Sequence, residues 1–179
     1  MENIAGLEGI GKYDKLRYEQ TISFLKKNVP PPCKVLDLGT PNRLSEVMQK
    51  NGYQVQNTLG EDFDFNPSFI KSYKADVVTS FEVFEHLLAP FNILREIEAP
   101  KLIATVPLKL WFADAYWNEK NDWDCHYHEF EKKQFDFLLR KTGWKVKDSA
   151  LWTGPVGSMG LRPLLRKFTY RFYAVYCER

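Results

Sequence analysis

Acidic residues and histidines gather in two short segments of the chain. Glu82, Glu85 and His86 lie in the first segment, where a helical turn would place Glu82 and His86 on the same side. His126 and His128 lie in the second segment. A histidine beside a bound hydroxyl group can act as a general base near neutral pH. We therefore interpret both segments as candidates for proton transfer. The structural alternatives are a capping and salt-bridge cluster in the first segment and hydrogen bonding of a loop by His128.

The second segment also permits a metal interpretation, because imidazole, thiolate and carboxylate groups are transition-metal ligands. Its further candidate ligands are Asp122, Asp124 and Cys125. A structural zinc site usually takes a second, separated pair of ligands. The other contributors that the sequence offers, Glu85 and His86, are distant along the chain. We assign no metal ligand, and we keep a metal-dependent hydrolase centred on residues 122–128 as one alternative function.

The elements that position these residues follow from apolar spacing and from helix-ending residues. The predicted helices cover 14–28 with Asp14 as its cap, 42–51 with Asn42 as its cap, 90–97 and 130–142. The predicted strands cover 34–39, 53–58, 75–80, 101–106, 144–151 and 168–177. Residues 59–74 leave room for at most one short strand and a helical turn. Residues 108–129 form a connection long enough to suggest a lid or binding loop, and residues 152–167 form a loop.

Strands that alternate with helices imply parallel crossovers and a sheet covered by helices on both faces. Only a loop is predicted between the last two strands, which favours an antiparallel hairpin at the edge of the sheet. We predict an α/β three-layer sandwich with a mostly parallel sheet, formed by one domain over residues 1–179. Its N-terminal segment, residues 1–30, is expected to be helical and to pack on the core. Ligands of such sheets bind at the carboxyl ends of the strands, near the point where the strand order reverses.

The residues after the predicted strands resemble a known family, the class I S-adenosylmethionine-dependent methyltransferases. Residues 35–39, Val-Leu-Asp-Leu-Gly, match the start of that family's cofactor motif, and residues 76–87 match its fourth-strand motif. Thr105-Val106-Pro107, then His126, His128 and Phe130, then Gly143-Trp144 follow in the family's order. The resemblance covers residues 14–150. It is greatest to the small bacterial members that carry a glutamate-histidine signature after the fourth strand.

The resemblance implies a Rossmann-like methyltransferase fold and methyl transfer from S-adenosylmethionine, with S-adenosylhomocysteine as the product. It implies an oxygen or nitrogen atom of a small or conjugated acceptor as the target. The cofactor-binding residues that it implies are Asp37, Gly39, Thr40, Arg43, Asn57, Thr58, Asp62, Phe81 and Glu82. The residues that it places at the acceptor, as candidate catalytic bases, are His126, His128 and His86.

Two positions depart from the family's pattern. Pro41 and Arg43 replace the second and third glycines of the cofactor loop, so only Gly39 permits close approach of the backbone. Arg43 could instead donate to the cofactor carboxylate. Asn57 and Thr58 stand where the family places a carboxylate for the ribose hydroxyls, and Glu61 or Asp62 could supply that carboxylate. These departures motivate a second alternative, a non-catalytic binding protein with the same fold.

The composition of the chain limits the classes of binding partner that we expect. The chain has 179 residues and a net charge of +2, which gives no strong attraction to nucleic acid or to an anionic membrane. Its 3 cysteines are too few and too scattered for a disulfide framework, and no segment reads as a secretory signal or a membrane span, so we expect a cytoplasmic location.

Aromatic residues make up 15% of the chain. Those expected around the cleft, where their faces could stabilise a sulfonium, are Tyr13, Trp111, Phe112, Tyr116, Trp117 and Trp123. The basic segment 162–167 is expected to be a solvated connection, or else a contact for a phosphorylated acceptor.

Overall fold

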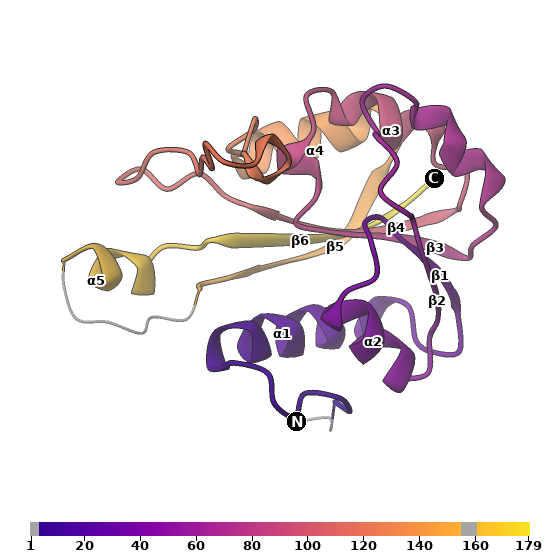
Figure 1. Ribbon diagram of the computed structural model, residues 1–179, viewed down its shortest axis with the longest axis horizontal. Helices are drawn as coiled ribbons and strands as arrows, with labels where there is room; N and C mark the ends of the chain where they lie inside the picture. The colour runs from indigo at the N-terminus through magenta and orange to yellow at the C-terminus, as the bar shows by residue number, and fades with distance from the viewer. Residues whose placement is uncertain (1–3, 155–160) are drawn as a thin grey trace.

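A computed structural model describes residues 4–154 and 161–179 (Figure 1). The described residues form a six-stranded sheet with the order β2-β1-β3-β4-β6-β5. Its strands are β1 (Lys34–Asp37), β2 (Gln54–Asn57), β3 (Val77–Phe81), β4 (Lys101–Pro107), β5 (Lys145–Trp152) and β6 (Phe172–Glu178). Strands β2, β1, β3 and β4 are parallel, whereas β6 runs antiparallel to both β4 and β5. The predicted α/β fold with a mostly parallel sheet and an antiparallel pair at one edge is confirmed.

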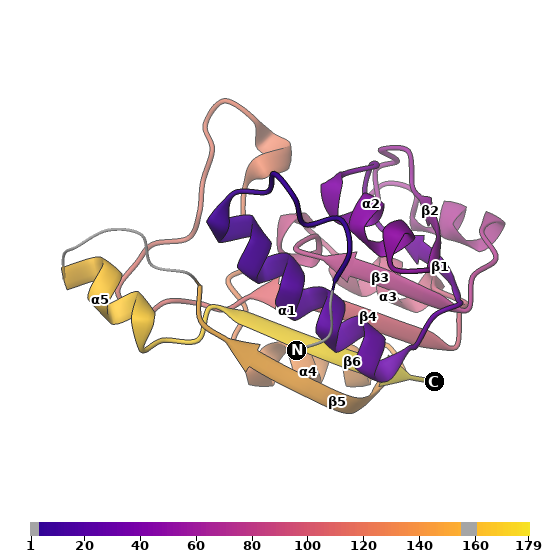
Figure 2. The same ribbon diagram turned by 90° about the horizontal axis from the view of Figure 1, so that it is seen from below.

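Helices cover both faces of the sheet. The α-helices are α1 (Lys12–Asn28), α2 (Arg43–Lys50), α3 (Pro90–Glu96), α4 (Lys132–Lys141) and α5 (Leu161–Lys167). Three short 3-10 helices are η1 (Pro67–Ser72), η2 (Phe84–His86) and η3 (Asp122–Asp124). Figure 1 shows α1 and α2 on one side of the sheet and α3 and α4 on the other, while α5 projects beyond the ends of β5 and β6. The view from below in Figure 2 shows α1 lying across the sheet.

Each face of the sheet has its own apolar core, because alternate residues of a strand point to opposite faces. Val35, Val77 and Ile103 pack with α1 and α2, which contribute residues such as Ile22 and Val47. Their neighbours in the sequence face the other way: Leu36, Val78 and Leu102 pack with residues of α3 and α4. Every one of these strand residues is at most 2% exposed. Burial on both faces explains why the strands read as continuous apolar runs.

Several helix boundaries lie where the sequence predicts them. Asn42 caps α2 by accepting hydrogen bonds from the backbone N–H groups of Leu44 and Ser45. Pro90 is the first residue of α3, where its missing N–H is not needed. Gly143 follows α4 with a φ of 90°, in the left-handed region that glycine reaches most readily.

Other boundaries differ from the prediction. Helix α1 starts at Lys12 with Gly11 as its N-cap, and Asp14 lies inside the first turn, where it pairs with Arg17. Residues 59–74 contain the 3-10 helix η1 and no strand, which agrees with the prediction of at most one short strand and a helical turn. Part of the predicted loop 152–167 is helical, since residues 161–167 form α5, and residues 155–160 lie outside the described part of the chain. Strand β6 begins at Phe172 rather than at residue 168.

Arg179 connects two helices to the sheet at the amino-terminal ends of the parallel strands, opposite their carboxyl ends. Its Nη2 donates to the carbonyl oxygens of Leu94 at 2.6 Å and Thr142 at 2.8 Å, at the C-terminal ends of α3 and α4. The guanidinium also lies over the Trp144 ring, 4.3 Å from its centroid, and the indole N–H donates to Leu94 at 3.1 Å. A positive charge at two helix C-termini is favourable because it opposes both helix dipoles.

None of the helices in the described part of the chain is long and apolar enough to cross a membrane.

We expect Arg179→Ala to lower the free energy of unfolding by about 2 kcal/mol, because it removes charge-assisted hydrogen bonds to two helix ends. Urea unfolding followed by circular dichroism measures the loss. Arg140→Ala is the control, since Arg140 lies exposed in the last turn of α4 and its side chain stacks on exposed Phe137. Equal stability losses in the two variants would contradict this role of Arg179.

Candidate functional site

Asp37 is the centre of a hydrogen-bonded cluster at the carboxyl ends of β2, β1 and β3. One carboxyl oxygen, Oδ1, accepts from Thr79 Oγ1 at 2.6 Å, and the other accepts from Asn57 Nδ2 at 3.0 Å. Asn57 Nδ2 also donates to the carbonyl oxygen of Gly39 at 3.2 Å. Burial raises the pKa of Asp37 to about 7, although the hydrogen bonds from Thr79 and Asn57 oppose the shift. The cluster therefore joins three neighbouring strands through one buried carboxyl group.

Gly39 and Thr58 close the same cluster. The Gly39 N–H donates to Thr58 Oγ1 at 2.7 Å, and the Thr58 N–H donates to the Asp37 carbonyl at 3.1 Å. Gly39 has a φ of 125°, and a Cβ added to it would meet no atom within 4 Å. The backbone at Gly39 is thus in a conformation that suits glycine, with open space beside it into which a ligand can come close.

The remaining residues expected at the cofactor lie farther out. Thr40 is exposed, and Phe81 is half-buried at the end of β3. Arg43 pairs with Glu46 at 2.5 Å and donates to the Glu8 carbonyl at 3.2 Å, so its guanidinium is engaged with α2 and the N-terminal segment. Asp62 accepts from the backbone N–H groups of Asp64 and Phe65, and it therefore stabilises its own turn.

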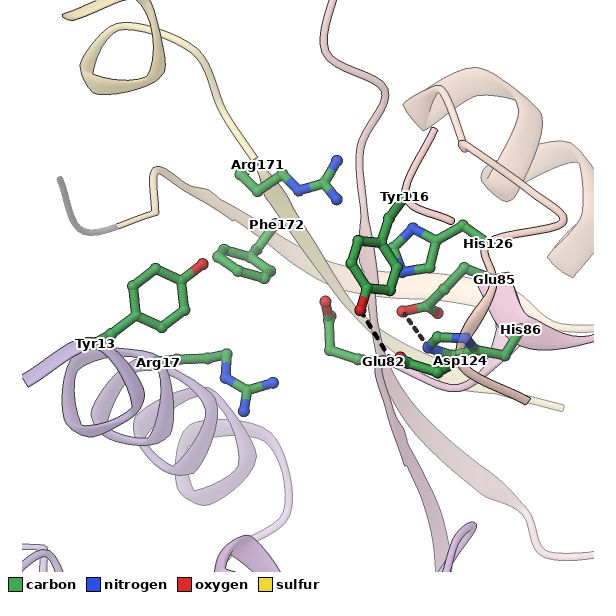
Figure 3. A pocket seen from close by; sticks show the side chains of 10 residues that line it. All are labelled: Tyr13, Arg17, Glu82, Glu85, His86, Tyr116, Asp124, His126, Arg171 and Phe172. Atoms are coloured by element: carbon green, nitrogen blue, oxygen red, sulfur yellow. Dashed lines mark hydrogen bonds and ion pairs between the residues drawn. The ribbon is translucent and has the colours of Figure 1, made fainter. Parts of the chain in front are cut away.

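A cavity of about 250 Å³ lies between α1, the segment that follows β3 and the long connection (Figure 3). It is lined by Tyr13 and Arg17 of α1, Glu82, Glu85 and His86 after β3, Tyr116, Asp124 and His126 of the long connection, and Arg171 and Phe172 at the start of β6. Figure 3 shows these side chains converging from the helix on one side and from the connection on the other. Glu82 belongs both to this cavity and to the set of residues expected at the cofactor.

Two glutamates carry much of the buried polarity of the cavity. Glu85 is 0% exposed, and neither of its carboxyl oxygens has a hydrogen-bond partner among the described residues. Its Oε1 lies 3.8 Å from His86 Nε2, beyond hydrogen-bond distance. Burial raises the pKa of Glu85 well above its usual range, and the nearby negative charge of Glu82 adds to the rise. Burial also raises the pKa of Glu82, against the influence of the Thr105 side chain, Arg17 and Arg171. Glu82 Oε1 is likewise buried and without a hydrogen-bond partner.

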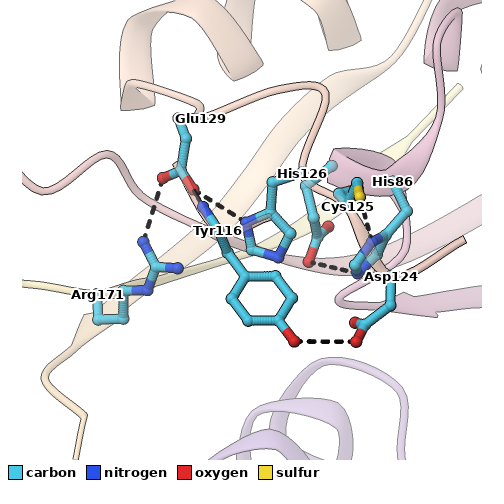
Figure 4. Close-up of polar contacts among 8 residues, drawn as sticks. His86, Tyr116, Asp124, Cys125, His126, Glu129 and Arg171 are labelled. Carbon is cyan, nitrogen blue, oxygen red and sulfur yellow. Dashed lines mark hydrogen bonds and ion pairs between the residues drawn. The ribbon is translucent and has the colours of Figure 1, made fainter. Parts of the chain in front are cut away.

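His86 and His126 face each other in the cavity, with ring centroids 4.9 Å apart. The Nδ1 atom of His86 lies 3.0 Å from the Cys125 carbonyl oxygen, which can only accept, so this nitrogen carries the proton. The Nδ1 atom of His126 lies 3.0 Å from Glu129 Oε1, and the hydrogen bond from His126 helps to hold the pKa of Glu129 below its usual range. Figure 4 shows these contacts together with the ion pair between Glu129 and Arg171. Both imidazoles, when neutral, have the lone pair on Nε2.

The third histidine is not brought to the cavity. His128 Nε2 lies 3.3 Å from the Leu88 carbonyl oxygen, and its ring stacks on Phe130 with centroids 5.3 Å apart. The position of His128 favours the loop-bonding interpretation over that of a base at the acceptor.

The further candidate ligands of the alternative metal cluster, Asp122, Asp124 and Cys125, do not converge with His126 in the structure. Asp124 accepts hydrogen bonds from Tyr116 and Asn118, Cys125 Sγ contacts the carbonyl oxygens of Asn118 and Asn121, and Asp122 is exposed. The carboxylate of Asp124 and the thiol of Cys125 thus hold the connection in shape. The residues whose ligand atoms converge, within 4.8 Å of one another, are Glu85, His86 and His126.

The sequence predicted the aromatic lining only in part. Tyr13 and Tyr116 line the cavity, whereas Trp111, Trp117 and Trp123 are 74%, 58% and 68% exposed. The lining residues that the sequence analysis did not consider are Arg17, Arg171 and Phe172, whereas Glu85 and Asp124 were considered there without being assigned to the site. One of these had a signal in the sequence, because Tyr13 and Arg17 are four residues apart on a helix and share a face.

Comparison with known proteins identifies the fold. No protein-family model matches the sequence, and no curated protein matches it. The structure resembles Burkholderia thailandensis 1,6-didemethyltoxoflavin-N1-methyltransferase with bound 1,6-didemethyltoxoflavin and S-adenosylhomocysteine. That TM-score is 0.56 at 15% identity, and the match covers 94% of this chain and 84% of that one. Coclaurine N-methyltransferase bound to N-methylheliamine and S-adenosylhomocysteine gives 0.57 at 13% identity, over 96% of this chain and 75% of that one.

The same fold also occurs in a protein named for a different reaction. The [4+2]-cyclase SpnF gives a TM-score of 0.59 at 9% identity, over 96% of this chain and 84% of that one. At such low identities the comparisons show the Rossmann-like methyltransferase fold, and the chemistry has to be argued from the site.

The buried carboxyl group of Asp37 makes the stability of the protein depend on pH. Its folded-state pKa of about 7 lies above the unfolded value. The stability that the protonated carboxyl group adds is therefore fully present below about pH 4 and is lost as the pH rises through 7. The loss amounts to about 4 kcal/mol at most. In Asp37→Asn this contribution is absent. We expect the wild-type free energy of unfolding, measured in urea from about pH 5 to 8, to fall relative to that of the variant. Parallel pH profiles would contradict the prediction.

Proposed function

We propose that this protein transfers a methyl group from S-adenosylmethionine to an oxygen or nitrogen atom of a small or conjugated acceptor. The observation that carries the proposal is the position of Gly39. It follows β1, whose two neighbours, β2 and β3, lie on opposite sides, so the strand order reverses beside it. Ligands of open α/β sheets bind at this reversal, outside the carboxyl ends of the strands. The open space at Gly39 lies at that place.

The residues around Gly39 fit the cofactor in chemistry as well as in position. The two methyltransferases compared above carry S-adenosylhomocysteine on the same fold. Gly39 would give the cofactor close approach to the backbone. Its N–H donates to Thr58, and Asp37 in turn accepts from Asn57, so hydrogen bonds hold the loop in place. Asn57 would face the ribose with its carbonyl oxygen, since its Nδ2 already donates to Asp37 and Gly39. Arg43 could reach the cofactor only by leaving Glu46 and the Glu8 carbonyl.

The cavity beside Glu82 is the proposed acceptor site. S-adenosylmethionine supplies an electrophilic methyl group with a neutral leaving group, so positioning of the acceptor accounts for much of the rate. Tyr13 and Phe172 offer apolar surface on one side of the cavity. Arg17 and Arg171 also line it, but each already pairs with a carboxylate, Asp14 and Glu129 respectively. A hydroxyl acceptor must also lose a proton, and Glu82, His86 and His126 are the groups in the cavity placed to assist. The glutamate-histidine signature noted in the sequence thus belongs to the acceptor end of the site.

We expect the purified protein to bind S-adenosylhomocysteine and Gly39→Ala to weaken that binding by about tenfold or more, since the new methyl group fills the open side. Isothermal titration calorimetry measures both affinities. Gly143→Ala is the matched control. It also places a Cβ at a positive φ, but at the opposite end of the sheet, where its nearest neighbour is Arg179 Nε at 3.7 Å.

Two outcomes would overturn the proposal. Either the wild-type protein shows no binding at millimolar S-adenosylhomocysteine, or a folded Gly39→Ala protein binds as tightly as Gly143→Ala. The first outcome would favour the non-catalytic alternative.

A further inference from the structure

We infer that Glu85, His86 and His126 form a binding site for one divalent transition-metal ion. Their candidate ligand atoms, one carboxylate oxygen and two imidazole nitrogens, all lie within 4.8 Å of one another. This inference does not depend on the proposed methyl transfer. With an ion bound, the Nε2 atoms of His86 and His126 would be ligands and would no longer serve as bases, which leaves Glu82 for that role. The inference also departs from the sequence analysis, which assigned no metal ligand.

The distances suit a single ion. Nitrogen and oxygen ligands lie about 2.0–2.2 Å from zinc and similar ions, so two ligands of a tetrahedral site are about 3.4 Å apart. Glu85 Oε1 and His86 Nε2 are 3.8 Å apart. This pair is therefore about 0.4 Å from the tetrahedral spacing, and the third ligand atom, from His126, lies within 4.8 Å of both.

The buried carboxyl group of Glu85 provides an independent reason to expect a cation. Its side chain is 1% exposed, and both oxygens lack a hydrogen-bond partner among the described residues. A buried carboxylate in this situation is costly, and proteins normally compensate it with hydrogen bonds, a positive charge or a metal ion. Figure 3 shows Glu85 directed toward His86 and His126 inside the cavity.

The Nδ1 atom of each histidine makes the kind of contact that the non-ligating nitrogen of a metal-bound histidine usually makes, a hydrogen bond to a carbonyl or carboxylate oxygen. His86 donates its Nδ1 proton to the Cys125 carbonyl, and His126 donates its Nδ1 proton to Glu129, which in turn pairs with Arg171 at 3.3 Å. These contacts fix both rings with Nε2 free for an ion (Figure 4).

The donor set also indicates the kind of ion. Two imidazoles and one carboxylate suit Zn²⁺, Fe²⁺, Co²⁺ or Mn²⁺ better than Mg²⁺ or Ca²⁺, which prefer oxygen ligands. Three protein ligands leave at least one position for water or for an oxygen atom of a bound molecule. The cavity supplies the space on that side, and the unpartnered Oε1 of Glu82 adds negative charge beside it.

Titration of the metal-free protein with Co²⁺ tests the inference, because Co²⁺ bound by protein nitrogen and oxygen atoms has visible d–d absorption. We expect one ion per chain, and we expect Glu85→Gln and His126→Ala each to weaken binding by about tenfold or more. His128→Ala is the matched control. His128 lies two residues from His126 on the same connection but contacts the Leu88 carbonyl, so this variant should bind Co²⁺ like the wild type.

Thermal unfolding without metal separates loss of a ligand from loss of the fold. Glu85→Gln removes a buried, unpartnered carboxyl group, so the metal-free variant should melt no lower than the metal-free wild type, while Co²⁺ should stabilise only the wild type. The inference is overturned if the wild-type protein fails to bind Co²⁺, Zn²⁺ and Mn²⁺ at millimolar concentration. It is equally overturned if folded Glu85→Gln and His126→Ala proteins bind as tightly as His128→Ala.

Discussion

The burial of carboxyl groups at one edge of the sheet is the constraint on which the rest of the site depends. Asp37 and Glu85 are 3% and 0% exposed, and Glu82 Oε1 is buried beside them. A buried carboxylate is costly unless hydrogen bonds or a positive charge compensate it. Asp37 receives hydrogen bonds from Thr79 and Asn57, on the strands at either side. The carboxyl group of Glu85 receives none in the described part of the chain, so the edge divides into an internally satisfied end and an end whose carboxyl oxygens have no hydrogen-bond partner.

Backbone hydrogen bonds explain how the long connection reaches the unsatisfied end. The carbonyl oxygen of Glu85 accepts from the N–H groups of Tyr127 and His128 at 2.9 and 3.1 Å. The His126 N–H donates to the Tyr116 carbonyl at 3.0 Å, and this bond closes the connection on itself. One residue, Glu85, therefore contributes its side chain to the cavity and its backbone to the anchor that places His126 there. Figure 4 shows that the Glu129–Arg171 pair extends this anchoring to the start of β6.

The sequence predicts the scaffold better than the site. Local apolar patterns determine the strands and helices, whereas contacts between segments far apart in the sequence assemble the site. Val35, Val77 and Ile103 lie in short apolar runs bounded by turn residues, and such local patterns are enough to place β1, β3 and β4. The helix α5 carries Pro163 and follows a glycine-containing stretch, so its local signal is that of a loop. The convergence of His126 on Glu85 depends on backbone bonds between distant segments, which no spacing rule records. By contrast, Asp122 and Asp124 have metal-ligand side chains and spacing, yet Asp122 is exposed and Asp124 is used by its own loop.

The backbone at Glu82 connects the two ends of the edge. Glu82 has a φ of 59°, the only positive φ of a non-glycine residue in the described ranges, 4–154 and 161–179. Such a conformation costs energy for a residue with a Cβ, and it persists where surrounding structure enforces it. Here the Glu82 N–H donates to the Thr105 carbonyl at 3.0 Å, which continues the β3–β4 pairing while the chain turns into η2. The turn leaves Phe81 at the reversal of strand order and brings Glu85 and His86 to the cavity. A glycine would relieve the strain but would remove the carboxyl group, so the strained backbone at this position comes together with a side chain that lines the cavity.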